Sequence, residues 1–162
     1  MRSFISLNLL EYAVVIINYA VCSNLIQKSR SNIEYPVLMN WSDNRSAISW
    51  TKRATRSTTA GMALARIFCC LAFNNPVACS ASYISTSDNH CADLISRLQA
   101  NDQTSFNPSA LFQKYPMMKS YHHLNLSLDF LSCLMQGLLS GTFQKLGSLP
   151  QPLLRDPGED TS

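Results

Sequence analysis

Apolar residues dominate the run from Leu7 to Gln27, and their spacing is typical of a helix. An apolar residue recurs there at steps of three and four, at Leu7, Leu10, Val14, Ile17, Val21 and Leu25. Steps of this size place side chains on one face of an α-helix. We therefore expect a buried helix over this run, with these six side chains on its inward face.

Two shorter apolar runs, bounded by proline and polar clusters, predict strands. Residues 37–41 follow Pro36 and end in a Ser-Asp-Asn turn cluster, and residues 77–85 alternate in polarity. Capping and stop residues predict helices over 45–52, 58–73 and 91–99. The order helix, strand, helix, helix, strand, helix indicates an α/β fold with parallel neighbouring strands.

The chain changes character after residue 100. Residues 101–145 resemble a linker with short amphipathic helices, at 111–121 and 126–139. Residues 146–162 are rich in proline and end in acidic residues, so we expect a disordered tail. The sequence thus predicts one α/β domain over 1–100, followed by less ordered segments.

Composition favours an ordered protein with a basic central region. The 162 residues are 46% hydrophobic and 14% charged, with a net charge of +3, so global disorder is excluded. No acidic residue occurs from Asn44 to Ser87, where five basic residues fall: Arg45, Lys52, Arg53, Arg56 and Arg66. Such a region suits a polyanion, and a solvated helix face is the simpler alternative.

The six cysteines contain no C-x-x-C pair. They predict reduced, mostly buried thiols in an intracellular protein rather than a zinc module or a disulfide framework. Glu11 and Asn18 interrupt the apolar N-terminal run, and a charge inside a membrane span costs roughly 2.5–3.5 kcal/mol. We therefore expect a buried helix and no membrane association. A cleaved signal peptide ending near Cys22 is the alternative.

Three acidic residues occupy positions that suit an α/β active site. Glu11 lies on the apolar N-terminal helix, Asp43 follows the first strand, and Asp93 lies in the first turn of the helix after the second strand. Ligands gather at the carboxyl ends of parallel strands. The three carboxylates together would suit a hard cation such as Mg²⁺. Taken singly, they also suit a solvent-facing residue, a turn former and a helix-dipole partner.

Three segments resemble, in order, motifs of the ribonuclease H domain of retroelement reverse transcriptases, with DIRS-like and gypsy-like elements the closest. They are "NLLEYAVVI" (8–16), "WSDNRSAISWTKRATRS" (41–57) and "YISTSDNHCADLISR" (83–97). The last is the most specific, because five of its residues stand in register with the family pattern: Asn89, Ala92, Asp93, Ser96 and Arg97. The resemblance covers residues 6–98, about 60% of the chain.

The resemblance implies metal-dependent hydrolysis of the RNA strand in an RNA–DNA hybrid, with Mg²⁺ or Mn²⁺ held by Glu11, Asp43 and Asp93. It also implies nucleic-acid contacts, at Asn44, Lys52, Arg53, Arg56, Ser57 and Asn89. The family's first catalytic aspartate has no counterpart, because no acidic residue precedes Glu11. Residues 1–100 would form a partial ribonuclease H-like domain without its first three strands. We therefore expect a polyprotein fragment that partners an upstream reverse transcriptase segment and is inactive or nearly so alone.

Other groups of residues that could form a catalytic, zinc-binding or base-stacking site have less support from the sequence. His90 and Cys91 lack a third group that would orient a nucleophile, and a zinc site from Cys79, His90 and Cys91 lacks a fourth ligand. Trp41 and Trp50 suggest core packing rather than base stacking. Two alternative functions stay open. One is a non-enzymatic nucleic-acid-binding remnant, and the other is a small secreted or membrane-associated protein with an N-terminal signal.

Overall fold

The computed structural model describes residues 5–28, 36–53, 58–89, 125–143 and 149–154, with 92, 112–113 and 115–116. Its helices and strands are α1 (Leu7–Lys28), β1 (Val37–Ser42), α2 (Arg45–Lys52), α3 (Thr59–Asn74), β2 (Ala78–Tyr83) and α6 (Leu128–Ser140). These elements confirm a mixed α/β fold and lie within two residues of the predicted bounds. The helix predicted over 91–99 lies outside the described residues, apart from Ala92.

The chain forms two compact units. One comprises residues 1–83 with 125–162, and the other residues 84–124. This division differs from the boundary predicted near residue 100, because α6 joins the N-terminal elements in one core. The predicted tail from 146 also differs in part, since residues 149–154 are described as part of the first unit.

The two strands pair in parallel, as the order of elements predicted. The register runs from Val37 opposite Ala78 to Ser42 opposite Tyr83. Side chains of β1 alternate between an exposed outer face and an inner face that carries Asn40 and Ser42, both buried. A parallel pair needs its backbone and inner face covered by helices, and α1 supplies this cover.

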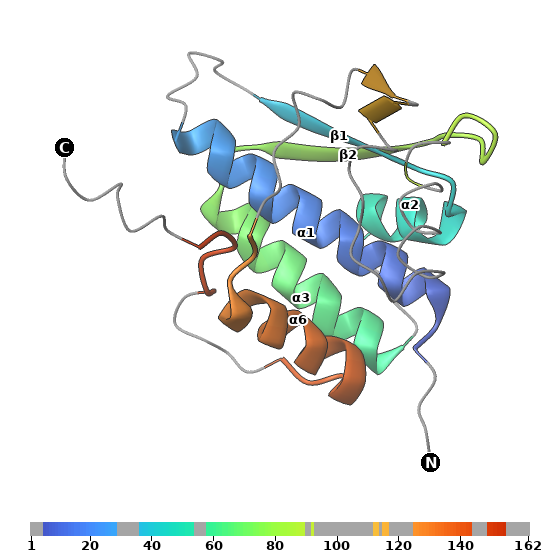
Figure 1. Ribbon diagram of the computed structural model, residues 1–162. Helices are drawn as coiled ribbons and strands as arrows, with labels where there is room; N and C mark the ends of the chain where they lie inside the picture. The colour runs from blue at the N-terminus through green and yellow to red at the C-terminus, as the bar shows by residue number, and fades with distance from the viewer. Residues whose placement is uncertain are drawn as a thin grey trace. The chain divides into compact units, whose positions relative to one another are not determined.

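Helix α1 lies between the strand pair and the helices α3 and α6, as Figure 1 shows. The hydroxyl of Tyr19 donates a hydrogen bond of 2.7 Å to the carbonyl oxygen of Val77, just before β2. On the other side, the ring of Phe68 on α3 lies 5.2 Å from the ring of Tyr19 and 6.4 Å from that of Tyr12. Aromatic contacts of this kind dominate core energetics, so α1 is the centre of the fold.

The inward face predicted for α1 is wrong. Four of its six members are exposed, namely Leu7, Leu10, Val14 and Leu25, and Val14 exposes 59% of its surface. The buried face instead centres on Tyr12, Ile16 and Tyr19, which are fully buried. Both faces repeat at helical spacing, so periodicity alone does not choose between them. The larger aromatic side chains bury more area, and Tyr19 also finds a hydrogen-bond partner.

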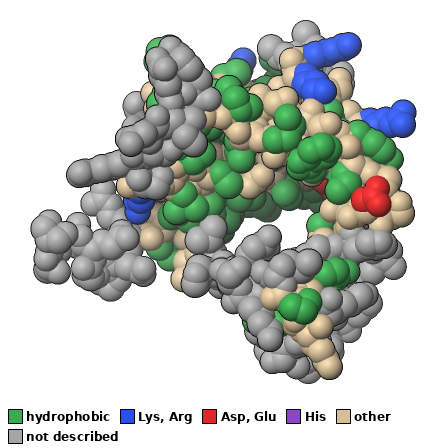
Figure 2. All heavy atoms as spheres, turned by 90° about the horizontal axis from the view of Figure 1, so that it is seen from above, with side chains coloured by type: hydrophobic (Ala, Val, Ile, Leu, Met, Phe, Trp, Pro, Cys, Tyr) green, Lys and Arg blue, Asp and Glu red, His purple; other side chains and the backbone are tan. Residues whose placement is uncertain are grey.

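The outer face of β1 is apolar and open. Val37, Met39 and Trp41 are exposed there, Trp41 by 62%. Figure 2, viewed from the side of the two strands, shows hydrophobic side chains in the open on this face. The core position predicted for Trp41 is therefore wrong, because odd-numbered side chains of β1 point away from α1. Trp50 confirms the prediction, since its ring packs edge-on against Tyr12 at 5.8 Å.

Helices α3 and α6 pack closely because small residues meet at their contact. A Cβ atom on Gly137 would lie 3.4–3.7 Å from side-chain atoms of Ile67, Leu64 and Ala63. Helix α6 ends at Gly141, whose φ of 65° is left-handed and whose amide donates to the carbonyl of Gly137. Phe130 of α6 is fully buried in the same core as α1 and α3.

In the described residues, one helix is long and apolar enough to cross a membrane by length and composition, and it is α1. Half of its most apolar window is buried inside the fold. Core helices and signal sequences both meet this criterion. The finding therefore leaves the choice between the predicted buried helix and the alternative signal peptide open.

The packing of α6 predicts a large effect of one substitution. Phe130→Ala removes a fully buried ring and should lower the free energy of unfolding by about 3–5 kcal/mol. Urea unfolding followed by circular dichroism measures this change. The matched control on the same helix is Leu139→Ala, at a site exposed by 55%, which should change the free energy by less than about 1 kcal/mol. Equal effects of the two substitutions would contradict a shared core.

Candidate functional site

Asp43 lies in the tight turn that joins β1 to α2. The backbone amide of Asn44 donates to the hydroxyl oxygen of Ser42 at 3.0 Å, which closes the turn around Asp43. Asn44 then caps α2, because its side-chain oxygen accepts from the amide of Ala47 at 3.0 Å. The local sequence thus holds the carboxylate half-buried, just beyond the carboxyl end of a parallel strand.

A second bond from the same cap connects this turn to α1. The side-chain nitrogen of Asn44 donates to the side-chain oxygen of Asn8 at 2.9 Å. Glu11 lies three residues after Asn8 and therefore on the same side of the helix. The link brings Glu11 and Asp43, two of the three predicted carboxylates, to one place in the structure.

Polar residues of α1 form a stripe that faces β1 and its turn. Asn8 bonds Asn44, Glu11 interacts with Asp43, and the side-chain nitrogen of Asn18 donates to the side-chain oxygen of Asn40. The partner number falls as the number along α1 rises, so α1 runs antiparallel to β1. These contacts determine which residues of α1 lie beside the turn after β1.

Sequence reasoning missed three asparagines as positioning residues, namely Asn8 and Asn18 of this stripe and Asn40 of β1. Their signal was available, because Asn8 and Asn18 stand on an otherwise apolar helix at the same side as Glu11. Asn40 likewise stands inside an apolar strand and is only 4% exposed. A buried amide of this kind requires hydrogen-bond partners, and Asn18 and Cys79 supply them.

Glu11 sits in an environment that disfavours its charge. Partial burial raises the pKa of its carboxyl above the ordinary value of 4.5, and the negative charge of Asp43 raises it further. Both causes act on the ionised form, the first through lost hydration and the second through repulsion. A pair of carboxylates with this repulsion is stabilised when a cation or a proton lies between them.

The third predicted carboxylate, Asp93, lies outside the described residues, as do Arg56 and Ser57. Within the described part of the chain, no group of three or more His, Cys, Asp or Glu side chains is arranged to hold a metal ion. The observed arrangement is therefore a carboxylate pair. A pair supplies fewer protein ligands than a closed cation site and leaves most coordination positions to water or substrate.

The residues that were predicted to contact nucleic acid differ in the interactions of their side chains. Both ends of the Asn44 amide serve structural hydrogen bonds. Lys52 and Arg53 are exposed at the C-terminal end of α2. Arg45, at the start of α2, places its guanidinium 5.1 Å from the centre of the Tyr83 ring and so ties α2 to the end of β2.

Asn89 lies in the second unit, at the end of a turn that begins at Ser85. Its backbone amide donates to the carbonyl of Ser85 at 3.0 Å. The hydroxyl of Ser85 also donates to the carboxylate of Asp88 at 2.6 Å. This geometry makes Asp88 a turn residue. His90 and Cys91, the other candidates in this segment, are outside the described residues.

The five described cysteines are free thiols, at Cys22, Cys69, Cys70, Cys79 and Cys133. Cys69 is exposed and the others are half-buried, so the prediction of mostly buried thiols is wrong in degree. Burial raises the pKa of the Cys79 thiol, although the hydrogen bond from Asn40 partly offsets this. A protonated thiol is a poor metal ligand, which weakens the zinc site considered at Cys79.

Comparison with known proteins gives no match to a protein-family model, a curated protein or a solved structure. The functional argument therefore depends on the residues themselves and on the geometry described above.

The raised pKa of Glu11 predicts how stability depends on pH. Its folded-state pKa is above the unfolded value, so ionised Glu11 destabilises the fold at pH 7, and this cost disappears as pH falls below about 4.5. Glu11→Gln should therefore raise the free energy of unfolding at pH 7, by less than about 1 kcal/mol because solvent screens the pair. Urea unfolding at pH 7 and pH 4 measures the difference.

Asp129→Asn is the matched control for this prediction. Asp129 lies in the first turn of α6, where a negative charge stabilises the helix. Its neutralisation should lower stability at pH 7, opposite in sign to Glu11→Gln. A loss of stability in Glu11→Gln that is the same at both pH values would contradict the raised pKa.

Proposed function

We propose that this chain is a segment of a ribonuclease H-like domain of a retroelement reverse transcriptase. The activity of that class is metal-dependent hydrolysis of RNA in RNA–DNA hybrids. The observation that supports this most is the carboxylate pair, because Glu11 on α1 and Asp43 after β1 come from separate motifs of the resemblance and interact in the structure. The carboxyl end of a parallel strand is where α/β enzymes place such groups.

The surface of α1 and β1 supports a partial domain. Apolar side chains are exposed on both elements, among them Leu10, Val14, Met39 and Trp41. In the described part of the chain, β1 has one neighbouring strand, β2. Open edges and apolar sheet faces are ordinarily paired or covered. We propose that an upstream reverse transcriptase segment supplies strands that pair with the open edge of β1.

Glu11 and Asp43 fit a divalent cation, because a cation between them relieves the repulsion that raises the pKa of Glu11. Mg²⁺ or Mn²⁺ would be held by these two carboxylates, and in the proposal also by Asp93. The ion supplies charge stabilisation and an activated water to phosphodiester hydrolysis. The protein's own contribution is to hold Glu11 and Asp43 at one place through the Asn8–Asn44 bond.

The family's first aspartate has no counterpart before Glu11. In the family that the chain resembles, that residue bridges two metal ions. We therefore propose that this chain alone has little or no activity on RNA–DNA hybrids. The partners in this proposal are an RNA–DNA hybrid and the upstream segment. The proposed location is intracellular, without membrane association.

The exposed basic side chains favour a second candidate, a nucleic-acid-binding remnant without catalysis. Lys52 and Arg53 at the end of α2 and Arg66 on α3 are exposed. Such side chains bind phosphates without metal and lose affinity as salt increases. Binding of an RNA–DNA hybrid that falls with salt and is unchanged by EDTA would support this candidate over the first.

Metal binding tests the carboxylate pair directly. The protein should bind Mn²⁺ in a titration followed by electron paramagnetic resonance of the free ion. Glu11→Gln and Asp43→Asn should each weaken binding by about tenfold or more, equivalent to about 1.4 kcal/mol. Asp129→Asn removes a charge of the same sign away from the pair and should leave the affinity unchanged.

The cleavage assay uses a labelled RNA–DNA hybrid with Mg²⁺ and the chain alone. Little or no cleavage is expected, because the first aspartate is lacking. Robust cleavage that EDTA prevents and Asp43→Asn abolishes would contradict the proposed inactivity, while Mn²⁺ affinity unaffected by either substitution would contradict the site itself.

A further inference from the structure

Two glycines define how α3 and α6 face each other. A Cβ atom on Gly141 would lie 2.7 Å from the Cγ2 atom of Thr59, near the start of α3. A Cβ atom on Gly137 would lie 3.4 Å from Cδ1 of Ile67 and 3.7 Å from Cβ of Ala63. Residue numbers fall along α3 as they rise along α6, so the two helices run antiparallel. One turn back along α6 therefore corresponds to one turn forward along α3.

This register brings Cys133 of α6 opposite Cys70 of α3. Cys133 precedes Gly137 by four residues and so lies on the same side of α6, one turn earlier. Cys70 follows Ile67 by three residues and Ala63 by seven, so it lies on the side of α3 that faces α6. Burial raises the pKa of the Cys133 thiol, and the charge of Cys70 raises it further. The second effect requires the two thiols to lie near each other.

The spacing of packed helices suits a bond between these two thiols. Cα atoms lie about 2.3 Å from a helix axis and packed axes lie about 8–10 Å apart, so facing Cα atoms are about 3–5 Å apart and offset ones somewhat further. A disulfide requires Cα atoms about 4.4–6.8 Å apart. Both thiols are free and half-buried. Facing cysteines at this contact can therefore be bridged without separating the helices.

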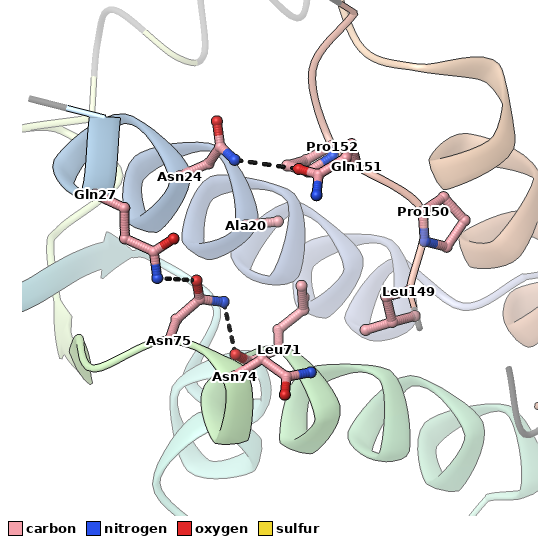
Figure 3. A pocket seen from close by; sticks show the side chains of 10 residues that line it. All are labelled: Ala20, Asn24, Gln27, Leu71, Asn74, Asn75, Leu149, Pro150, Gln151 and Pro152. Carbon is pink, nitrogen blue, oxygen red and sulfur yellow. Dashed lines mark hydrogen bonds between the residues drawn. The ribbon is translucent and has the colours of Figure 1, made fainter. Parts of the chain in front are cut away.

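The helix ends that carry the two thiols are held in place. The side chain of Asn75, after α3, donates to the carbonyl of Leu71 at 2.7 Å and accepts from Gln27 of α1 at 2.6 Å. Before α6, the amide of Ser127 donates to the carbonyl of Pro152 at 3.0 Å. Figure 3 shows the cavity of about 240 Å³ that Gln27, Leu71, Asn75 and Pro152 help to line. These bonds restrict the motion of α6 against α3 and keep the facing positions together.

We propose that Cys70 and Cys133 form a site of oxidative modification, at which hydrogen peroxide produces a disulfide that joins α3 to α6. One thiolate attacks a peroxide oxygen, so that an S–O bond forms, the O–O bond breaks and hydroxide leaves. The second thiolate attacks the resulting sulfenic sulfur, so that the S–S bond forms and hydroxide leaves again. The two thiol protons convert both hydroxides to water. The two sulfurs together lose two electrons, and the peroxide gains them.

The site is specific to one of two adjacent cysteines. Cys69 is exposed, because it lies about 100° around α3 from Cys70 and so points away from the contact with α6. The bond would close a loop that contains the whole second unit, residues 84–124. A cross-link over a long loop stabilises the fold mainly by restricting the unfolded chain. This inference concerns a separate part of the first unit and is independent of the carboxylate pair.

Peptide mapping tests the bond on the full chain. The reduced protein is treated with stoichiometric hydrogen peroxide, its remaining thiols are alkylated, and it is digested with trypsin without reductant. Peptide 67–97 should be linked to peptide 120–145, and tandem mass spectrometry should place the bond between Cys70 and Cys133. The same link should form in Cys69→Ser, the matched control at the neighbouring position. Absence of this bond, or a bond from Cys133 to another cysteine, would overturn the proposal.

Thermal unfolding tests the effect of the bond. The oxidised protein should melt roughly 5–15 °C above the reduced protein, and dithiothreitol should reverse the gain. Cys70→Ser and Cys133→Ser should each abolish the gain, while Cys69→Ser should keep it. If a serine variant does not fold in its reduced form, the mapping of the wild-type chain still decides. A gain in Cys70→Ser as large as that of the wild type would overturn the assignment.

Discussion

The cover that α1 gives to the parallel strand pair is the constraint on which the other features depend. Two parallel strands have a poor independent stability, because their inner face must be buried and its polar groups must be satisfied. Asn40 is the critical point of that face, since its buried amide needs partners and obtains them from Asn18 and Cys79. Together with the bond from Tyr19 to Val77, these contacts fix the direction and position of α1 against both strands.

With α1 in this position, its two halves lie in different chemical environments. Its N-terminal half brings Glu11 to the turn at Asp43, where repulsion and burial raise the pKa of Glu11. Its C-terminal half places Asn24 and Gln27 beside the end of α3, where they line a cavity. In the function proposed above, a divalent cation would relieve the repulsion between the two carboxylates.

The fold could be predicted in its elements, but the candidate site only in part. Glu11 and Asp43 were identified from separate segments, and the structure brings them together. The asparagines that position them were not identified, because an isolated asparagine on an apolar helix has no local meaning until its partner across the fold is known. The position of Trp41 was predicted wrongly for a similar reason, since its local sequence does not show whether the outer face of the strand is covered, and in the structure that face is exposed.

The sequence by itself determined the bounds of the helices and strands and the parallel relation of the strands. These follow from local causes, such as the cap at Asn44, proline before β1 and the alternation of helices with strands. Only the tertiary structure decided which side of α1 is buried and that α6 belongs to the core. Both sides of α1 have helical periodicity, so the choice rests on contacts of Tyr12 and Tyr19 with residues some fifty positions away. Such contacts have no signature in any single segment.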